Sequence, residues 1–164
     1  MRYEGVSLNP SREVPMRFWT GLSPLFLSLL RIVAGLLLLE FGTMKILHFP
    51  YDQYFASVPQ GCTAAATEAF VVQVGGCSLS LLWVAGLIEL VGGVLLTAGL
   101  FTRLVAFILS GEMAFAYFMV HAPQGFYPAI NKGLPAVLFC FVFLFLSAAG
   151  AGSVSLDRLL RRAS

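Results

Sequence analysis

Four long stretches of the chain are almost entirely apolar, and each is close to the length of a helix that crosses a lipid bilayer. Crossing about 30 Å of hydrocarbon takes about 20 helical residues at about 1.5 Å each. Helices are expected because a backbone in lipid must satisfy its own hydrogen bonds, and no stretch alternates as a barrel strand does. The predicted spans are residues 24–47, 79–100, 102–120 and the shorter 134–149.

The composition agrees with a chain whose main solvent is lipid. Apolar residues make up 59% of the sequence and charged residues 11%, whereas a soluble domain carries about 25% charged residues. No linker divides the chain, so one domain is expected. The predicted fold is all-α, a four-helix transmembrane bundle over residues 24–152, between a polar tail (1–23) and a basic tail (153–164).

The basic residues predict the orientation. If the chain crosses four times, seven arginines fall on one side of the membrane, which the positive-inside rule assigns to the cytoplasm. Both termini are then cytoplasmic and the protein is a multi-pass protein of a bacterial inner membrane. Basic residues at membrane edges read as topology signals, so no nucleic-acid partner is expected. The seven are Arg2, Arg12, Arg17, Arg103, Arg158, Arg161 and Arg162.

The loop of residues 48–77 is predicted to lie outside the cytoplasm, in an oxidising compartment. It contains Cys62 and Cys77, which could form a structural disulfide, remain free thiols or act as a redox pair. Closing this loop would stabilise the fold by roughly 3 kcal/mol on the chain-entropy model. Residues 63–74 could form a short amphipathic helix on the surface. Cys140 reads as a small packing residue within the fourth span.

Two acidic residues stand in the middle of apolar spans, where the solvent is hydrocarbon. Glu89 and Glu112 are about eleven residues either side of the turn between spans two and three, so they are expected at the same depth. Two ionised carboxylates in a low dielectric repel, so at least one should be protonated or paired with a cation. Arg31 and Lys45 on span one are the candidate cations.

Span one carries a face of small and basic residues. At 100° per residue its members fall within about 60° of one another, and small residues permit a close helix neighbour. Glu40 lies about 180° from this face and is not assigned a partner within the chain. The face on span one is Arg31, Gly35, Leu38, Gly42 and Lys45, and the matching face on span two is Ala85, Glu89 and Gly93.

Two readings of the buried charges stay open. They could be a hydrogen-bonded network that fixes helix register, or a site for a ligand or for protons. At the outer face, His48, His121, Asn131 and Lys132 are candidate polar residues. The two histidines are far apart in sequence and lack metal-ligand spacing, so hydrogen bonding is expected and a metal site is not.

Several segments resemble the DoxX family of small bacterial membrane proteins. The resemblance implies a four-helix membrane bundle and a link to quinone-coupled redox reactions. Some relatives are subunits of thiosulfate:quinone oxidoreductase, and others are associated with oxidative-stress complexes. The segments are LRIVAGLLLLEFGTMKILHFP (30–50), GLIELVGG (86–93), LFTRLVAFILSGEMAFAYFMVHAPQGFYP (100–128) and FLSAAGAGSVSLD (145–157).

The resemblance also maps a polar signature onto the chain, with departures. Phe41 stands where many members have His, Met44 where Gln is usual and His48 where Gly is usual. Residues 131–134 replace a common Asn-Gly-Gly-Glu, and the segment with both loop cysteines is unusual for the family. The signature positions are Arg31, Gly42, Lys45, Glu89, Gly93, Arg103, Glu112 and Asn131.

The expected function is a DoxX-like membrane component of a redox system, with a cleft for quinone or another small apolar ligand. Glu89 or Glu112 would exchange protons, and Arg31 or Lys45 would hold negative charge. The sequence has no dinucleotide fingerprint, Fe–S spacing or haem-type His pair, so electrons would come from a partner protein and the chain is not expected to be a complete enzyme. The alternatives are a non-catalytic assembly subunit, with a membrane partner or as a homo-oligomer, and a small transporter or channel.

Overall fold

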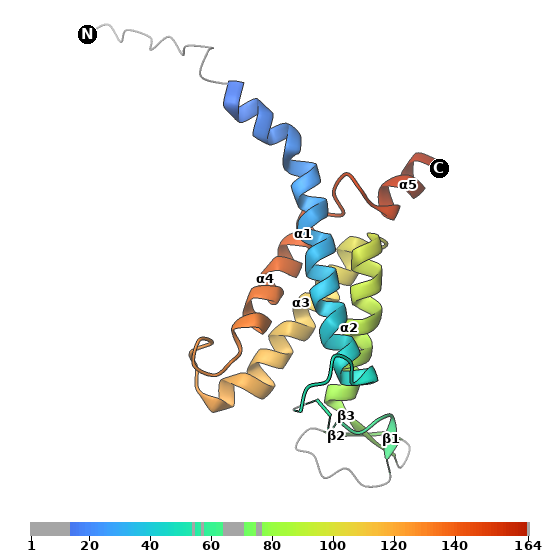
Figure 1. Cartoon of the computed structure of the whole chain (residues 1–164), viewed down its shortest axis with the longest axis vertical. Helices are drawn as coiled ribbons and strands as arrows, with labels where there is room; N and C mark the ends of the chain where they lie inside the picture. The colour runs from blue at the N-terminus through green and yellow to red at the C-terminus, as the bar shows by residue number, and fades with distance from the viewer. Residues whose placement is uncertain (1–13, 54, 57, 64–70, 75–76, 164) are drawn as a thin grey trace, which may run out of the picture.

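The computed structural model is mainly helical and describes residues 14–53, 55–56, 58–63, 71–74 and 77–163 (Figure 1). Four helices pack along one another, and a short fifth helix follows them. Helix α3 continues through a π-helical turn, η2, and a 3₁₀ turn, η3. The helices are α1 (Val14–Leu47), α2 (Leu81–Ala98), α3 (Thr102–Ala116), η2 (Tyr117–His121), η3 (Ala122–Gln124), α4 (Leu134–Ala149) and α5 (Leu156–Ala163).

Three helical stretches are long and apolar enough to cross a membrane: Trp19–Leu47, Leu81–Ala98 and Thr102–Gln124. Helix α4 is apolar but has 16 residues, so the predicted count of four spans and the orientation stay predictions. Helix α1 begins at Val14, well before the predicted start of span one. The surface is rich in exposed Leu, Val, Ile and Phe side chains. Such a surface is typical of a protein that faces lipid.

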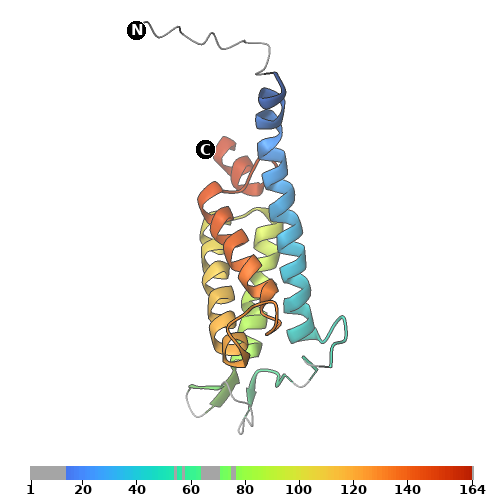
Figure 2. The ribbon, with the colours of Figure 1, turned by 90° about the vertical axis from the view of Figure 1, so that its left-hand side faces the viewer.

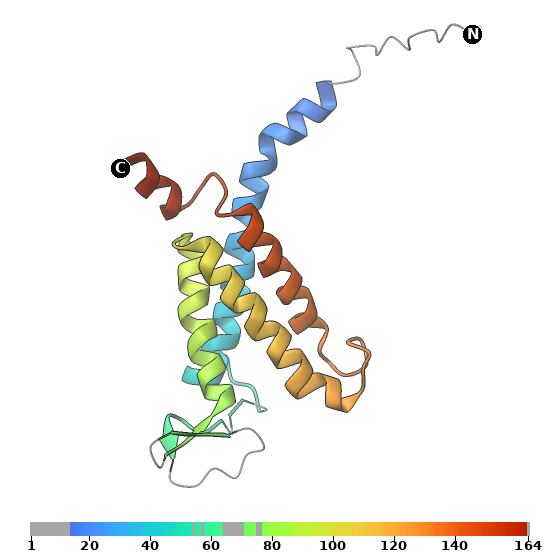
Figure 3. The ribbon, with the colours of Figure 1, turned by 180° about the vertical axis from the view of Figure 1, so that it is seen from behind.

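The two ends of the molecule differ. The start of α1, the turn between α2 and α3, and α5 lie at one end, here called the α5 end, and a small sheet lies at the opposite sheet end (Figures 2 and 3). Between them the helices share one apolar core. It is formed by Ala34, Leu38, Leu96, Val105, Ala106, Leu109, Met113, Phe143 and Leu146.

Helices α1 and α2 form the most extensive contact, and glycines bring their backbones together. A Cβ atom at Gly42 would lie 2.6 Å from the Leu90 nitrogen, and one at Gly93 would lie 2.9 Å from the Leu39 nitrogen. These separations are too short for any side chain, so the helices touch through main-chain atoms. The glycine positions are those of the small-residue faces predicted from the sequence.

The loop at the sheet end contradicts one prediction. The sequence suggests that residues 63–74 could form a short amphipathic helix, but Val71–Val74 forms strand β2, antiparallel to β3 (Cys77–Ser80). Strand β1 (Cys62–Thr63) pairs with the other edge of β3, giving the order β1-β3-β2. Three valines favour a strand over a helix, and Gly-Gly between two such runs is a hairpin signal.

The same sheet contains both cysteines of the predicted disulfide. Cys62 lies opposite Leu79 in the pairing of β1 with β3, and Cys77 is two residues from Leu79 along β3. The backbones of the two cysteines are therefore on neighbouring strands. The side chain of Cys62 is outside the described part of the structure, so the Cys62–Cys77 disulfide stays a prediction.

Substituting Gly42 should test the close helix contact. We expect Gly42→Ala to lower the free energy of unfolding by about 1–3 kcal/mol, because its Cβ meets backbone that cannot move aside. Gly111→Ala is the matched control, since nothing lies within 4 Å of its Cβ position, and alanine there should be neutral or stabilising by up to about 1 kcal/mol. Thermal unfolding in detergent measures both. Equal effects of the two substitutions would contradict the backbone contact.

Candidate functional site

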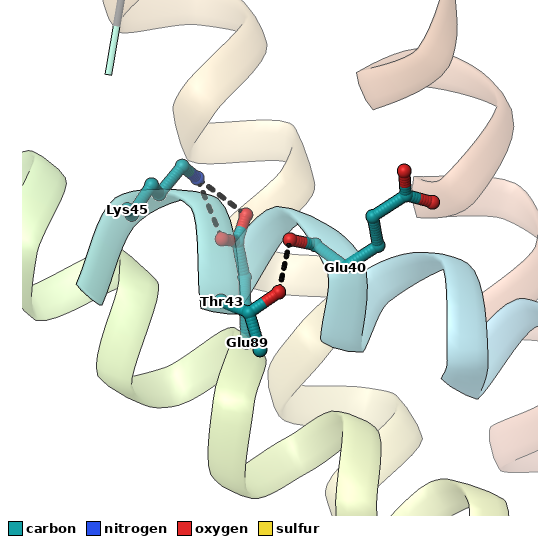
Figure 4. Close-up of polar contacts among 4 residues, drawn as sticks. All are labelled: Glu40, Thr43, Lys45 and Glu89. Atoms are coloured by element: carbon teal, nitrogen blue, oxygen red, sulfur yellow. Dashed lines mark hydrogen bonds and ion pairs between the residues drawn. The ribbon is translucent and has the colours of Figure 1, made fainter. Parts of the chain in front are cut away.

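A buried ion pair joins α1 to α2. The Lys45 Nζ atom donates to both carboxylate oxygens of Glu89, each at 2.6 Å (Figure 4). The two residues are 8% and 3% exposed, so water hardly reaches the pair. Gly86, one helical turn before Glu89, lets Lys45 approach, since a Cβ there would lie 2.8 Å from the Lys45 Cβ. Each charge is compensated by the other in the protein interior.

The chain that follows α1 covers this pair from the sheet end. The Phe55 ring lies 5.6 Å from Lys45 Nζ, a cation–π distance. The Gln60 side chain donates to the Lys45 carbonyl at 3.1 Å and to the Val58 carbonyl at 3.1 Å, and Val58 is buried. The ammonium group is therefore within interaction distance of both Glu89 and an aromatic ring.

Glu112 on α3 supplies a second carboxyl group near the pair. Both of its oxygens are buried, and no group in the described part of the chain hydrogen-bonds to either. The side chain is close enough to Glu89 and Lys45 for electrostatic interaction with both. A buried carboxyl group without a hydrogen bond is costly, by about 1–3 kcal/mol for a neutral group and more for a charged one. This carboxyl group is the one buried ionisable group that the fold leaves unsatisfied among the described residues.

An apolar groove with a volume of about 350 Å³ runs between α2 and α3. Neither carboxylate lines it, but Ile108, one helical turn before Glu112, does. The other lining residues are Leu87, Ile88, Val91, Gly92, Leu95, Val105 and Leu109.

Arg31 is not part of this site, which corrects its assignment as a candidate cation for the carboxylates. It shares a helix face with Lys45, but fourteen residues of helix place it about 21 Å away along α1. Its guanidinium donates instead to four main-chain carbonyls at the α5 end. They are those of Leu96, Thr97 (2.8 Å), Ala151 (3.0 Å) and Val154 (2.6 Å).

The Arg31 contacts complete the C-terminus of α2. Gly99, with φ of 73°, ends that helix, and the amides of Gly99 and Leu100 bond back to carbonyls of its last turn. A cation at a helix C-terminus is favourable, and in lipid the last carbonyls need a donor from the protein itself. Arg31 is therefore a structural residue.

Asp157 was not identified from the sequence as a site residue. Its carboxylate accepts hydrogen bonds from the amides of Phe101 (2.7 Å) and Thr102 (2.9 Å), which begin α3. Partial burial raises the pKa of Asp157, but the hydrogen bonds outweigh this effect and hold the pKa below its ordinary value. A single acidic residue more than fifty positions from the helix it caps leaves no local sequence signal.

Glu40 lies apart from the ion pair. Its side chain points away from Lys45 and Glu89 (Figure 4), and the residue is exposed. The contact drawn for this residue is at its carbonyl oxygen, which accepts from Thr43 Oγ1 at 2.8 Å. Helical angles predict that Glu40 lies on the other side of α1 from the face that carries Lys45, and the structure agrees.

Three of the four outer candidates lie in two separate hydrogen-bond networks. His48 Nε2 is 3.2 Å from the Gln60 side chain, whereas His121 Nδ1 is 3.1 Å from the Asn131 carbonyl. Asn131 is buried, and its side chain binds main-chain groups of Gly125 and Gly133; Lys132 is exposed. Over the described residues, no three His, Cys, Asp or Glu side chains are grouped as metal ligands would be.

The remaining cysteine, Cys140, is a free thiol in contact with α3. Ser110 Oγ donates to the Cys140 carbonyl at 2.8 Å and lies 3.6 Å from its sulfur. This contact between α3 and α4 agrees with a packing role.

Comparison with known proteins shows the family. The family model for DoxX matches residues 26–122, which include the ion pair and Glu112. The chain belongs to the DoxX family. It is 41% identical to an uncharacterized protein of Haemophilus influenzae over 137 residues, 82% of this chain and 90% of the relative. No solved structure matches. This DoxX protein is thus a membrane protein, and the family predicted from its sequence is confirmed.

The ion pair should behave as a coupled unit. We expect Glu89→Gln to destabilise this DoxX protein by about 3–5 kcal/mol, because it leaves the Lys45 charge buried without a partner. The double variant Lys45→Met with Glu89→Met should recover most of that loss, since it removes both charges. Thermal unfolding of the purified variants in detergent measures both effects. A double variant at least as unstable as Glu89→Gln would contradict the coupling.

Proposed function

We propose that this DoxX protein is the membrane component of a redox system and binds a quinone or a similar small apolar ligand next to Glu112. The proposal places it in a bacterial inner membrane, with the α5 end on the cytoplasmic side. The observation that carries the proposal is the Glu112 carboxyl group, buried without a hydrogen-bond partner beside a pair whose charges already balance. A ligand carbonyl or hydroxyl group would supply the missing partner.

The protonation of the site follows from its charges. Lys45 neutralises Glu89, so an ionised Glu112 would add a net negative charge to a nearly dry interior. Glu112 is therefore assigned the neutral, protonated form in the resting protein. In that form it can donate a hydrogen bond to a carbonyl oxygen, and it can pass its proton to the same atom.

The residues present fit a quinone in two respects. Glu112 can hold a proton at the oxygen atom of the ligand, and the groove that includes Ile108 can accept an apolar tail. A bound quinone would supply two-electron redox chemistry at its carbonyl groups. Electrons would come from a partner protein, because the chain carries no recognisable electron carrier of its own.

Substitutions of Glu112 separate hydrogen bonding from proton exchange. We expect Glu112→Leu to weaken binding of a short-chain quinone by about tenfold, because a hydrogen bond in a buried site is lost. Glu112→Gln should keep affinity within about threefold, since the amide still donates, but should abolish the pH dependence of binding. Titration of purified protein in detergent, followed by intrinsic fluorescence, measures both. Glu40→Leu is the matched control, and it should bind as wild type does.

Two results would overturn the quinone proposal. The first is wild-type affinity in Glu112→Leu, and the second is an equal loss in Glu40→Leu. Either would show that the carboxyl group beside the ion pair does not contact the ligand.

A second candidate function rests on Glu40. An exposed carboxyl group on a spanning helix is unfavourable in lipid unless a partner or a proton satisfies it. A neighbouring transmembrane helix could do so, which favours an assembly subunit bound to another membrane protein or to a second copy. In that case Glu40→Leu should lose companions that copurify from native membranes, while Glu112→Leu should retain them.

A further inference from the structure

Helix α5 is strongly amphipathic. Leu156, Leu159 and Leu160 fall within an arc of roughly 100°, and they are 41%, 60% and 60% exposed. Arg158 and Arg161 lie on the opposite side of the helix and are also exposed. Three leucines facing water would each forgo about 1.5–3 kcal/mol of burial. An apolar side with a basic opposite side is typical of a helix that lies in the membrane surface.

Several hydrogen bonds fix α5 and the loop before it at the ends of the spanning helices. The Asp157 amide donates to the Gly99 carbonyl at 2.9 Å, in addition to the bonds from its carboxylate to the start of α3. The Ser153 amide donates to the Pro24 carbonyl at 3.1 Å, and the Val154 amide to Ser28 Oγ at 3.0 Å. Pro24 begins the predicted span one, and Gly99, Phe101 and Thr102 form the turn between α2 and α3, so α5 is held at the level where the predicted spans end.

A pocket of about 410 Å³ opens beside α5. It is lined by Arg103, Arg158 and Arg161, by the first residues of the predicted span one, and by the loop after α4. Asp157 is the one carboxylate in the lining, and its oxygens already accept two amide hydrogens. The lining therefore has an excess of positive charge.

Two of these arginines, Arg103 and Arg158, are held in place but keep donors for a ligand. Arg103 Nη1 donates to the carbonyls of Ser147 (3.2 Å) and Ala148 (2.6 Å), and Arg158 Nη1 donates to that of Ser153 (3.2 Å). These bonds use one nitrogen of each guanidinium. A fixed guanidinium with its other N–H groups unused binds a phosphate through paired hydrogen bonds.

We propose that this pocket binds the phosphate group of an anionic phospholipid in the leaflet that contains α5. The leucines of α5 would lie among the acyl chains, and the three arginines would surround the headgroup. The positive lining favours an anionic ligand, and the apolar side of α5, which suits the acyl-chain region of the same leaflet, favours a lipid phosphate over a free anion.

The test is lipid titration of the full chain in detergent, with short-chain phosphatidylglycerol and phosphatidylcholine as probes. Wild-type protein should prefer phosphatidylglycerol by on the order of 100-fold, and Arg158→Gln with Arg161→Gln should reduce that preference by about 25-fold, at about 5-fold per charge. Arg161→Gln alone should lose about 5-fold. Lys132→Gln, an exposed charge in the loop before α4, is the control and should match wild type.

Three outcomes would overturn the lipid site. One is an unchanged preference in the double variant when its lipid-free unfolding temperature equals that of wild type. Another is an equal loss in Lys132→Gln, which would indicate a general charge effect. The third is competition by inorganic phosphate at the concentration at which phosphatidylglycerol binds, which would show a site for a free anion.

Discussion

The close contact between α1 and α2 determines most of what this DoxX protein can do. Gly42 and Gly93 remove the side chains that would separate the two backbones, and Gly86 lets Lys45 come within hydrogen-bond distance of Glu89. In hydrocarbon, a charge is tolerable only when protein supplies its partner, so the ion pair and the glycines depend on each other. Without the close contact, Lys45 and Glu89 would be two isolated buried charges.

This pairing also explains why Glu112 stands out. With Lys45 committed to Glu89 through both oxygens, no cation in the described part of the chain is left to neutralise a third charge at that position. Arg31, the other buried cation, is committed to main-chain carbonyls at the opposite end of the core. The fold thus satisfies its buried cations and leaves one carboxyl group available for a ligand or a proton.

The sequence predicted α2, α3 and α4 closely because their limits coincide with local signals, whereas α1 begins well before the predicted span. The sequence predicted the start of α3 at residue 102 and both ends of α4 at residues 134 and 149. A turn glycine, Gly99, precedes α3, and Pro128 lies in the loop before α4. Helical angles placed Glu40 away from Lys45. Helical angles did not predict the partners of Arg31, because residues on the same face of a helix can still be far apart along its axis. The Val71–Val74 strand and the Asp157 cap were missed, since each depends on a partner supplied by tertiary contacts.

The most direct measurement of the central claim is infrared spectroscopy of the carboxyl groups in purified protein at neutral pH. If Lys45 is reserved for Glu89, Glu112 is protonated, and its carboxylic acid C=O band should disappear in Glu112→Gln while persisting in Glu40→Gln. A spectrum in which Glu112→Gln removes only carboxylate absorption would show that Glu112 is ionised. That result would contradict the assignment of a neutral carboxyl group beside the ion pair.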